Sequence, residues 1–356
     1  MEFFNKDQES ALAGMELAQW IAFAPVVFQA SRALKNFGIL SAVENSRKAG
    51  ITYKELLSQI SLSPYGMRVL CEAGLGIGLL FQHEKRYFLS KAGYFFLNDQ
   101  LTEANTDFIN DVCYKGLFSL EESIKTGKPE GLKVFGNWKT VYEALSQLPA
   151  DVQESWFKFD HHYSDGSFPA ALPVVFADSP GSLLDIGGNT GKWAFKCLEY
   201  NDKVHIAIMD LPGQLNVAKA NAAENGISDR MSFLEANVLD DSQKIPSGYD
   251  IIWMSQFLDC FSDDEIISIL RRCVKSMNIN SRIFIMETFW DRQQFKTAAF
   301  CLQMTSLYFT SMANGNSQMY NSVVFMDLIH KAGLKVEGIS DNIGVSHTIL
   351  KCKLPV

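Results

Sequence analysis

The sequence predicts an α/β protein, with a Rossmann-like, doubly wound sheet preceded by a mostly helical domain that has the element order of a winged helix. The length of 356 residues corresponds to about two domains. The hydrophobic fraction of 47% supplies a sizeable core and excludes a disordered chain. Beyond residue 181, apolar runs of strand length alternate with helical segments, which is the pattern of a doubly wound sheet.

The N-terminal domain is expected over residues 1–115. Leu17–Ala33 is apolar on nearly all sides, which predicts a helix buried in a core or in a subunit interface. Thr52–Glu55 forms a capping box, and Ser63–Gly78 begins with the Ser-Pro pair that opens a helix. Arg86–Ser90 then reads as a short strand after a turn. Three helices followed by a hairpin is the order of a winged helix.

Charge argues against DNA binding by this domain. Residues 1–115 carry eleven Lys and Arg against twelve Asp and Glu, a net charge of −1. The segment in the place of a recognition helix, Ser63–Gly78, has one Arg and one Glu, and so lacks the basic side chains that phosphate contacts require. The whole chain has a net charge of −8. The sequence therefore predicts a protein–protein role such as dimerisation, and no nucleic-acid partner.

Cysteine usage and the N-terminus predict a cytoplasmic protein. The seven cysteines are scattered and form no C-x-x-C pair, which fits reduced thiols better than disulfides or a zinc site. No metal is expected. Met1–Ser10 is polar and acidic, unlike a signal peptide. The uncharged run Leu17–Ser31 has 15 residues with Pro25 inside, too short to span a bilayer, so no membrane partner is expected.

The middle of the chain, residues 116–180, is predicted to be a helical connector that also supplies pocket helices. Trp138–Leu148 has helical spacing, and a second helical region over Phe157–Phe176 carries His161 and His162.

The C-terminal domain is expected over residues 181–356. The predicted strands are Ser182–Ile186, Val204–Met209, Met231–Ala236, Tyr249–Met254, Arg282–Glu287, Leu334–Ile339 and His347–Cys352. About seven residues separate the last two strands, so a hairpin is expected, with the final strand antiparallel to its neighbour.

A glycine-rich turn, Asp185–Gly191, follows the first of these strands and opens a helix. Gly187 and Gly188 allow a tight turn and a close approach of a ligand to the backbone. The spacing is not G-x-G-x-x-G, and Asp185 would repel a pyrophosphate. A carboxylate at this point suits a cationic ammonium group, such as the methionine end of S-adenosylmethionine.

The ends of the next two strands add to this site. Asp210 stands 25 residues after Asp185 and can bind ribose hydroxyls. Asn237 can hydrogen-bond an adenine edge while Val238 packs on the adenine face, although Asn237 is equally well explained as a turn residue. All these strand ends are expected along one carboxyl edge of the sheet.

Three segments together, Asp185–Gly191, Asp210–Pro212 and Phe261–Asp264, resemble the caffeic-acid-type (class I) small-molecule O-methyltransferases that use S-adenosylmethionine, and their bacterial relatives. The resemblance covers nearly the whole chain. Three segments are similar to the family's winged-helix dimerisation domain: Phe37–Val43, Thr52–Gly78 and Phe88–Gly93. Thr126–Pro129 is similar to its linker region. The resemblance implies S-adenosylmethionine as cofactor, a homodimer and a small-molecule acceptor.

The cofactor residues follow from the strand ends and the resemblance taken together. They are Asp185, Gly187, Gly188, Asp210, Leu211, Asn237, Val238 and Ser255. Three positions depart from the family pattern. Asn189 replaces the usual Gly, which is tolerable because Asn adopts positive φ more readily than most residues. Asn237 replaces the usual Asp, and Ser255 replaces a frequent Lys, which puts one cofactor contact in doubt.

The catalytic position shows the largest departure. In the family, a His after the fourth strand removes the proton from the substrate hydroxyl, and the aligned residue here is Asp259. An ordinary Asp, with a pKa near 3.9, is a weak base for a phenol. Glu287 stands where family members carry an acid that supports the His. If the two carboxyls face each other, like charge raises one pKa, so we expect the Asp259–Glu287 pair to act as the base.

Alternatives for the base remain open. Asp259 can instead cap the following helix, although Ser262 is better placed to do so. His161 or His162 can supply the base from the preceding helical region, and His347 is a weaker candidate. A second acid that the family often carries is missing, with Gln318 or Met319 in its place.

The acceptor pocket is expected around Thr297–Met326, an uncharged stretch of 30 residues that predicts two apolar helices flanking a polar turn. The expected substrate-binding residues are His162, Phe300, Met304, Tyr308 and Met312. Their spacing also fits plain core packing. An apolar, aromatic wall favours a hydroxylated aromatic or polyene-like acceptor.

Together these features predict methyl transfer to a hydroxyl oxygen of a small apolar or aromatic acceptor, with Asp259 in place of the usual His. Two alternatives remain: a family member that binds the cofactor for non-methylating chemistry, and a ligand-sensing winged-helix regulator.

Overall fold

The computed structural model describes residues 3–7 and 9–355. The chain divides into two compact units, one up to Asp107 and one from Phe108 onward. This division falls eight residues before the boundary expected at 115. The segment 116–180 belongs to the same unit as the C-terminal sheet.

The N-terminal unit is helical with one small antiparallel sheet. Its elements are α1 (Ala11–Asn36), α2 (Ile39–Asn45), β1 (Ile51–Thr52), α3 (Tyr53–Gln59), α4 (Pro64–Ile77), β2 (Leu80–His83), β3 (Arg86–Leu89), α5 (Lys91–Asn98) and α6 (Gln100–Asp107). The strand order is β1-β3-β2. The predicted order of three helices followed by a hairpin is observed, and the capping box of Thr52 and Glu55 is confirmed.

Helix α1 is longer than the predicted apolar segment and is largely exposed. Seven of its apolar side chains are between 46% and 68% exposed: Leu12, Met15, Leu17, Trp20, Ile21, Phe23 and Val26. Of the two environments predicted for this helix, burial in the core of its own chain is wrong. With 26 residues, α1 is long and apolar enough to cross a membrane. The prediction that this segment is too short to span a bilayer used only the 15 uncharged residues Leu17–Ser31, which are part of the longer helix.

Short helices open the second unit. A π-helical turn, Phe108–Cys113, is followed by α7 (Leu120–Thr126), α8 (Val141–Ala144), α9 (Ala150–Ser164) and α10 (Phe168–Val175). The helix predicted over Trp138–Leu148 is wrong in extent, because the Thr140 side chain accepts the N–H of Glu143 and so starts α8 at Val141.

A seven-stranded sheet carries the rest of the unit. The strands are β4 (Ser182–Ile186), β5 (His205–Asp210), β6 (Met231–Glu235), β7 (Ile251–Ser255), β8 (Arg282–Glu287), β9 (Lys335–Ile343) and β10 (His347–Lys353). Their order is β6-β5-β4-β7-β8-β10-β9. Strands β4 to β8 pair in parallel, and β10 is antiparallel to both β8 and β9. The predicted doubly wound sheet with an antiparallel last strand is confirmed.

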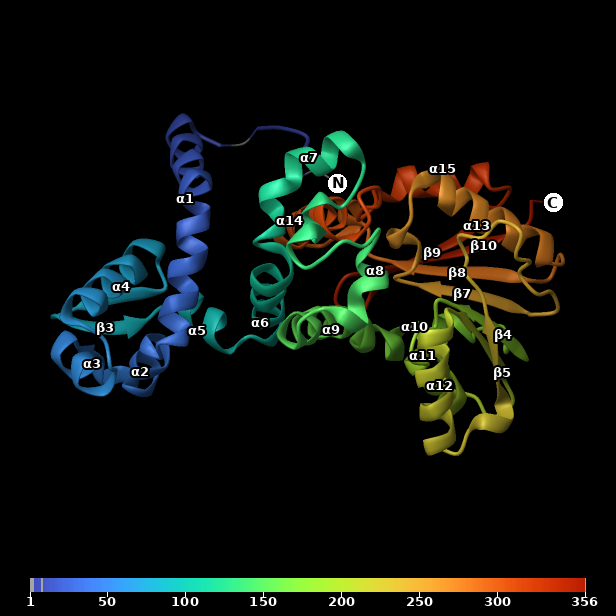
Figure 1. Cartoon of the computed structure of the whole chain (residues 1–356), viewed down its shortest axis with the longest axis horizontal. Coiled ribbons are helices and arrows are strands. Elements are labelled where there is room, and N and C mark those ends of the chain that lie inside the picture. Colours follow the sequence, from blue (N-terminus) through green and yellow to red (C-terminus); the bar gives the residue numbers. More distant parts are fainter. Residues whose placement is uncertain (1–2, 8, 356) are drawn as a thin grey trace. The chain divides into compact units, whose positions relative to one another are not determined.

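Helices cover both faces of this sheet (Figure 1). They include α11 (Lys192–Tyr200), α12 (Pro212–Glu224), α13 (Asp263–Ser276) and α15 (Ser322–Lys331). Helix α14 (Lys296–Tyr308) lies off the sheet, and its Tyr308 packs with Phe108 in a separate apolar cluster. In Figure 1, α11 and α12 lie on one side of the strands, and α13 and α15 lie on the other. Each face has its own apolar core: Trp193 stacks on Trp253 on one face, and Phe289 packs against Phe325 on the other. This two-faced burial leaves the strand ends as the accessible edge.

The last hairpin is tighter than expected. Three residues separate β9 from β10, instead of about seven, because β9 continues through polar residues to Ile343. Along β9 exposed and partly buried residues alternate, and Asp341 is held by Arg292 at 2.6 Å, so the polar end of the strand remains ordered at the sheet edge.

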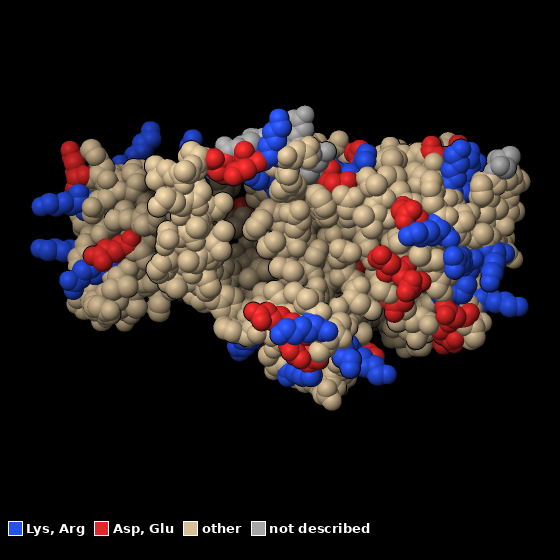
Figure 2. Space-filling model, turned by 90° about the horizontal axis from the view of Figure 1, so that it is seen from above, with Lys and Arg blue, Asp and Glu red and all other residues tan. Residues whose placement is uncertain are grey.

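Charge is distributed without a dominant sign on the visible surface. Figure 2 shows acidic and basic side chains interspersed over the face that it displays. On that face no continuous basic surface is present among the residues described, and the absence of a nucleic-acid partner stays a prediction.

Candidate active site

The carboxyl ends of four neighbouring parallel strands bring four of the predicted site residues to one edge. Asp185 lies in β4, Asp210 ends β5, Ser255 ends β7 and Glu287 ends β8. Asp185 pairs in register with Ile208 of β5 and with Trp253 of β7. The edge therefore presents carboxyl groups from three strands.

Asp210 is fixed by backbone amides. The N–H of Asn189 donates to Oδ2 at 2.8 Å, and the N–H of Leu211 donates to Oδ1 at 2.7 Å. Burial raises the pKa of Asp210, and these two hydrogen bonds oppose that rise. Asn189 has φ of 49°, the left-handed conformation expected for Asn in place of Gly. Asp210 is thus an oriented acceptor with lone pairs left for hydroxyl groups.

The two central glycines are required by close contacts. Gly187 has φ of +78°, and a Cβ there would lie 2.2 Å from the ring of Phe257. A Cβ at Gly188 would lie 2.6 Å from Oδ2 of Asp185. No larger residue fits either position without displacing its neighbours.

Asp185 is a buried carboxyl with an unused oxygen. It is 2% exposed, and among the described residues none donates a hydrogen bond to its Oδ2. Burial raises its pKa well above the usual range, and the charge of Asp210 adds to the rise. A cationic group at this edge would relieve both effects. These residues therefore fit a ligand that joins an ammonium group to ribose hydroxyls, as S-adenosylmethionine does.

The remaining cofactor candidates differ in accessibility. Leu211 is 41% exposed and Ser255 is partly exposed, so both can meet a ligand. Val238 is only 9% exposed and packs in the core. Asn237 accepts the N–H of Leu239 at 3.0 Å, which is the turn role given above as the alternative. Asn237 is exposed, so an adenine contact through its side-chain NH₂ stays a prediction.

Asp259 lies in a short turn, Leu258–Cys260, directly after β7. It is 6% exposed, and the thiol of Cys260 donates to its Oδ1 over 3.5 Å. Burial raises the pKa of Asp259 to about 7. The following helix α13 is capped by Ser262 with Glu265, so the alternative in which Asp259 caps this helix is wrong.

Glu287 supports the turn that carries Asp259. Its Oε1 accepts the N–H groups of Phe257 at 3.1 Å and Leu258 at 2.9 Å. Its Oε2 has no hydrogen-bond partner among the described residues. Burial raises the pKa of Glu287 well above its usual range, and the charge of Asp259 raises it further. The two carboxyls thus interact electrostatically, and Glu287 accepts the backbone N–H groups of two neighbouring residues.

Helix α9 contributes a third carboxyl that the sequence reasoning missed. The charge of Asp160 acts on Asp259, and burial together with Asp165 raises the pKa of Asp160 to about 6. One helical turn earlier, the indole N–H of Trp156 donates to the hydroxyl of Tyr308 at 2.7 Å. The signal available in the sequence was an acid placed four residues after a Trp in an aromatic helix.

The histidines lie apart from these carboxyl contacts. His161 is half-buried, and burial and the charge of Lys192 lower its pKa. The ring of His162 packs edge-on against Tyr163. His347 is 1% exposed, bonds Ser167 through Nδ1 at 2.8 Å, and has a pKa lowered by burial to about 4. Within the described ranges, none of the three hydrogen-bonds Asp259 or Glu287.

The expected acceptor wall divides into buried and exposed residues. Tyr308 is 5% exposed, and Met312 is fully buried against Gly116. Met304 and Phe300, one and two turns before Tyr308 in α14, are 43% and 53% exposed. The predicted arrangement of two helices with a polar stretch between them is confirmed by α14 and α15. At the position where the family often carries a second acid, the sulfur of Met319 accepts a hydrogen bond from the Thr288 hydroxyl.

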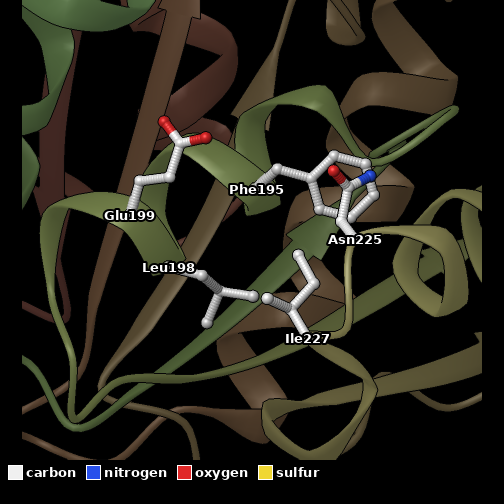
Figure 3. A pocket seen from close by; sticks show the side chains of 5 residues that line it. All are labelled: Phe195, Leu198, Glu199, Asn225 and Ile227. Carbon is white, nitrogen blue, oxygen red and sulfur yellow. The ribbon is translucent and has the colours of Figure 1, made fainter.

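A recess of about 180 Å³ lies elsewhere, between α11 and the end of α12. Figure 3 shows the five side chains that line it: Phe195, Leu198, Glu199, Asn225 and Ile227. None of them is a strand-end carboxyl or a predicted site residue. Among the described residues no group of three His, Cys, Asp or Glu is arranged to hold a metal ion.

Comparisons with known proteins agree with this geometry. Residues 15–87 match the Dimerisation2-like domain family, and residues 170–335 match the O-methyltransferase domain family. The chain is 22% identical over 327 residues to an L-tyrosine C(3)-methyltransferase of Streptomyces lavendulae, covering 91% of this chain and 87% of the relative.

Solved structures share the fold. The S-adenosylmethionine-dependent methyltransferase SibL superposes with a TM-score of 0.72 at 20% identity, over 95% of this chain and 98% of its own. The O-methyltransferase NcsB1, solved with S-adenosylmethionine and a hydroxynaphthoic acid, superposes with a TM-score of 0.66 at 19% identity, over 92% and 96%. Taken with the strand-edge carboxyls and the glycine turn, these matches show that the chain belongs to the class I S-adenosylmethionine-dependent O-methyltransferase family with an N-terminal dimerisation domain, and is a methyltransferase enzyme.

Proposed function

We propose that this enzyme transfers a methyl group to a small phenolic acceptor and that Asp259 is the general base. The observation that carries the proposal is a carboxyl group, buried beside Glu287, whose pKa is raised by burial to about 7. A base is most effective when its pKa lies near the working pH. The environment thus offsets the weakness of an ordinary Asp at the position where the family has His.

The proposed mechanism assigns one task to each residue. When bound, S-adenosylmethionine would supply a methyl group on a positively charged sulfur, and attack by a nucleophile on the methyl carbon would release S-adenosylhomocysteine. Asp210 would bind the ribose hydroxyls, and Asp185 would hold the ammonium group. Ionised Asp259 takes the proton from the acceptor hydroxyl and so creates a phenolate. Glu287 keeps the Asp259 turn in place through the N–H groups of Phe257 and Leu258.

The acceptor is proposed to be aromatic because aromatic side chains surround the base. Tyr142 interacts electrostatically with Cys260 and Asp259, and Tyr308 with Cys260 and Asp160. Trp156 and Phe159 come from the same face of α9 and pack in this cluster. Stacked and edge-on rings are a favourable surface for a phenol.

Methylation at a ring carbon is a second candidate. The relative that matches 91% of this chain is named as a methyltransferase acting at C(3) of L-tyrosine. A phenolate carries negative charge on the ring carbons ortho and para to the oxygen as well as on the oxygen, so the same base serves both outcomes. Carbon attack needs a second acceptor for the displaced ring proton, and we assign this to Oε2 of Glu287, which has no hydrogen-bond partner among the described residues.

One experiment separates these outcomes from the alternative of non-methylating chemistry. Calorimetry should show S-adenosylmethionine binding below millimolar concentration. Incubation of the protein with labelled cofactor and L-tyrosine, or a panel of simple phenols, should then give a labelled product. NMR distinguishes an O–CH₃ from a ring C–CH₃ product. Cofactor binding without any transfer would favour non-methylating chemistry, and absence of binding would remove the proposed site.

We further propose a homodimer formed through α1. The exposed apolar side chains of α1 include Trp20 and Ile21, and the matched dimerisation domain begins at residue 15. A second copy would bury this surface. Light scattering should give twice the monomer mass, and the double variant Trp20→Glu, Ile21→Glu should give the monomer mass.

The seven free cysteines support a reducing, cytoplasmic location.

A further inference from the structure

We propose that Arg272 of α13 is a positioning residue, which fixes the loop after β6, residues 237–243, in the shape that recognises adenine. The inference deepens the proposed function, because it rests on the assignment of Asn237 to the adenine end of S-adenosylmethionine. Arg272 acts on the cofactor through the loop, without a contact of its own.

Arg272 is a buried cation whose hydrogen bonds go to the backbone of this loop. It is 8% exposed, and its Nη2 donates to the carbonyl oxygen of Val238. Its Nη1 donates to the carbonyl oxygens of Asp240 at 3.1 Å and Gln243 at 3.4 Å. The ion pair with Asp241 is long, at 4.0 Å, and that carboxylate is 78% exposed. Burying a guanidinium is costly, so the three carbonyl groups that it joins are held firmly together.

The residues that Arg272 holds are the ones that fix Asn237. The N–H of Asn237 donates to Oε1 of Gln243 at 2.9 Å, and its carbonyl oxygen accepts the N–H of Asp240 at 3.0 Å. The side-chain Oδ1 of Asn237 accepts the N–H of Leu239 at 3.0 Å. Both backbone groups and the side-chain oxygen of Asn237 are therefore engaged within the loop.

This arrangement leaves the side-chain NH₂ of Asn237 as the group that can face a ligand. Asn237 is exposed and follows β6 at the carboxyl edge of the sheet, where Glu235 at the end of β6 pairs in register with Asp210. An NH₂ donor matches the N1 acceptor of adenine. Hypoxanthine carries a hydrogen on N1, so the same NH₂ would face a second donor. A loop that cannot turn this donor away discriminates between the two bases.

Helix α13 is a firm support for Arg272. The helix is capped by Ser262, and Cys273, the residue after Arg272, is buried in the core of the sheet. One turn before Arg272, the hydroxyl of Ser268 donates to the carboxylate of Asp241, which is a second bond between the helix and the loop. The position of the loop therefore follows that of α13.

The test compares two ligands that differ only in the purine, S-adenosylhomocysteine and S-inosylhomocysteine. Their dissociation constants are measured by calorimetry at pH 7.5 on the full-length protein, and the ratio of the two constants measures adenine recognition. We expect the wild-type protein to bind S-adenosylhomocysteine at least about tenfold more tightly. Arg272→Met, which puts an apolar chain in place of the buried cation, should reduce the ratio to below about threefold by weakening S-adenosylhomocysteine binding.

The matched control is Arg271→Met. Arg271 is the exposed neighbour of Arg272 in α13, and its guanidinium donates to the carbonyl oxygen of Lys331 at 3.1 Å, away from the loop. The ratio should stay at the wild-type value in this variant. General loosening of the domain would weaken both ligands alike, so a merely structural role of Arg272 would also leave the ratio unchanged.

Arg272→Lys gives a second measurement if Arg272→Met does not fold. It keeps the charge but offers one nitrogen to three carbonyl groups, so its ratio should be below about fivefold. The wild-type ratio in either folded variant would overturn the inference, and so would equal affinities for the two ligands in the wild-type protein.

The proposed function fails by a different result. Binding of neither ligand by the wild-type protein would contradict the cofactor site and, with it, both proposals. Tight binding of S-adenosylhomocysteine with an unchanged ratio in Arg272→Met would contradict the role of Arg272 alone. The measurement needs no acceptor, so it does not depend on which phenol the enzyme methylates.

Discussion

Two pairs of carboxyl groups lie at the same edge of the sheet, and their surroundings give them different chemistry. Asp185 and Asp210 stand at the ends of β4 and β5, where backbone amides of Asn189 and Leu211 hold Asp210. Asp259 follows β7 and Glu287 ends β8, and Asp259 accepts the thiol of Cys260, a residue that packs in the aromatic cluster. At Asp210 two backbone amides oppose the effect of burial on the pKa, whereas at Asp259 burial raises the pKa to about 7.

The largest expected effect is on the base. Asp259→Asn removes proton acceptance with little change in shape, so kcat for methyl transfer should fall at least about 100-fold, the usual scale for a general base. Cofactor affinity should stay within about twofold. Asp264→Asn, an exposed carboxylate in the first turn of α13, is the matched control and should keep normal kcat. An unchanged kcat in Asp259→Asn would give the role of base to another group.

A substitution in the first pair, Asp185 and Asp210, should lower the affinity for the cofactor. Asp210→Asn replaces a charged acceptor, so S-adenosylmethionine should bind about 10- to 100-fold more weakly in calorimetry. Asp250→Asn is a close control, since Asp250 also accepts two backbone N–H groups, those of Gly181 and Ser182, at the amino ends of the strands. Equal losses of cofactor affinity in both variants would show a general effect on folding instead of a binding role.

Gly187 connects the two pairs because Phe257 packs on it and donates its N–H to Glu287. Gly187→Ala would meet both a positive φ and the Phe257 ring, and should lower the free energy of unfolding by about 2 kcal/mol. Gly213→Ala, with open space around its Cβ position, should be neutral in the same denaturation experiment. Similar stabilities of the two variants would contradict the tight packing inferred at the glycine turn.

The smallest effect concerns stability against pH. The pKa of Asp259 is about 7 in the folded protein and near 3.9 when unfolded, so the folded state binds the proton more tightly between these values. Stability from this group is therefore present at low pH and is lost as the pH rises through 7. Asp259→Asn should raise the free energy of unfolding at pH 8 by on the order of 1 kcal/mol, and by less at pH 5. A variant that is less stable than wild type at pH 8 would contradict the raised pKa.

The cofactor edge could be predicted because its signals are local. The apolar run before Asp185 defines β4, the glycines define the turn, and the parallel pairing of strands brings Asp210 and Glu287 to the same edge. The capping of α13 by Ser262 was likewise readable from the side chains of four consecutive residues.

The acceptor side could not be predicted to the same depth because it depends on tertiary packing. Asp160 precedes Asp259 by 99 residues, and their interaction exists only because α9 packs beside the turn after β7. The apolar pattern of α14 did not distinguish buried Tyr308 from exposed Phe300, since a helix apolar on all sides gives no preferred face.

The most direct test of the central claim is the pH dependence of kcat for methyl transfer to a phenol that the enzyme accepts. With ionised Asp259 as the base, kcat should fall about tenfold for each pH unit below a midpoint near 7 and level off above it. In Asp259→Asn the residual rate should lose this acid limb. A wild-type profile that is flat between pH 5 and 8, or the same acid limb in Asp259→Asn, would contradict the assignment of Asp259 as the general base.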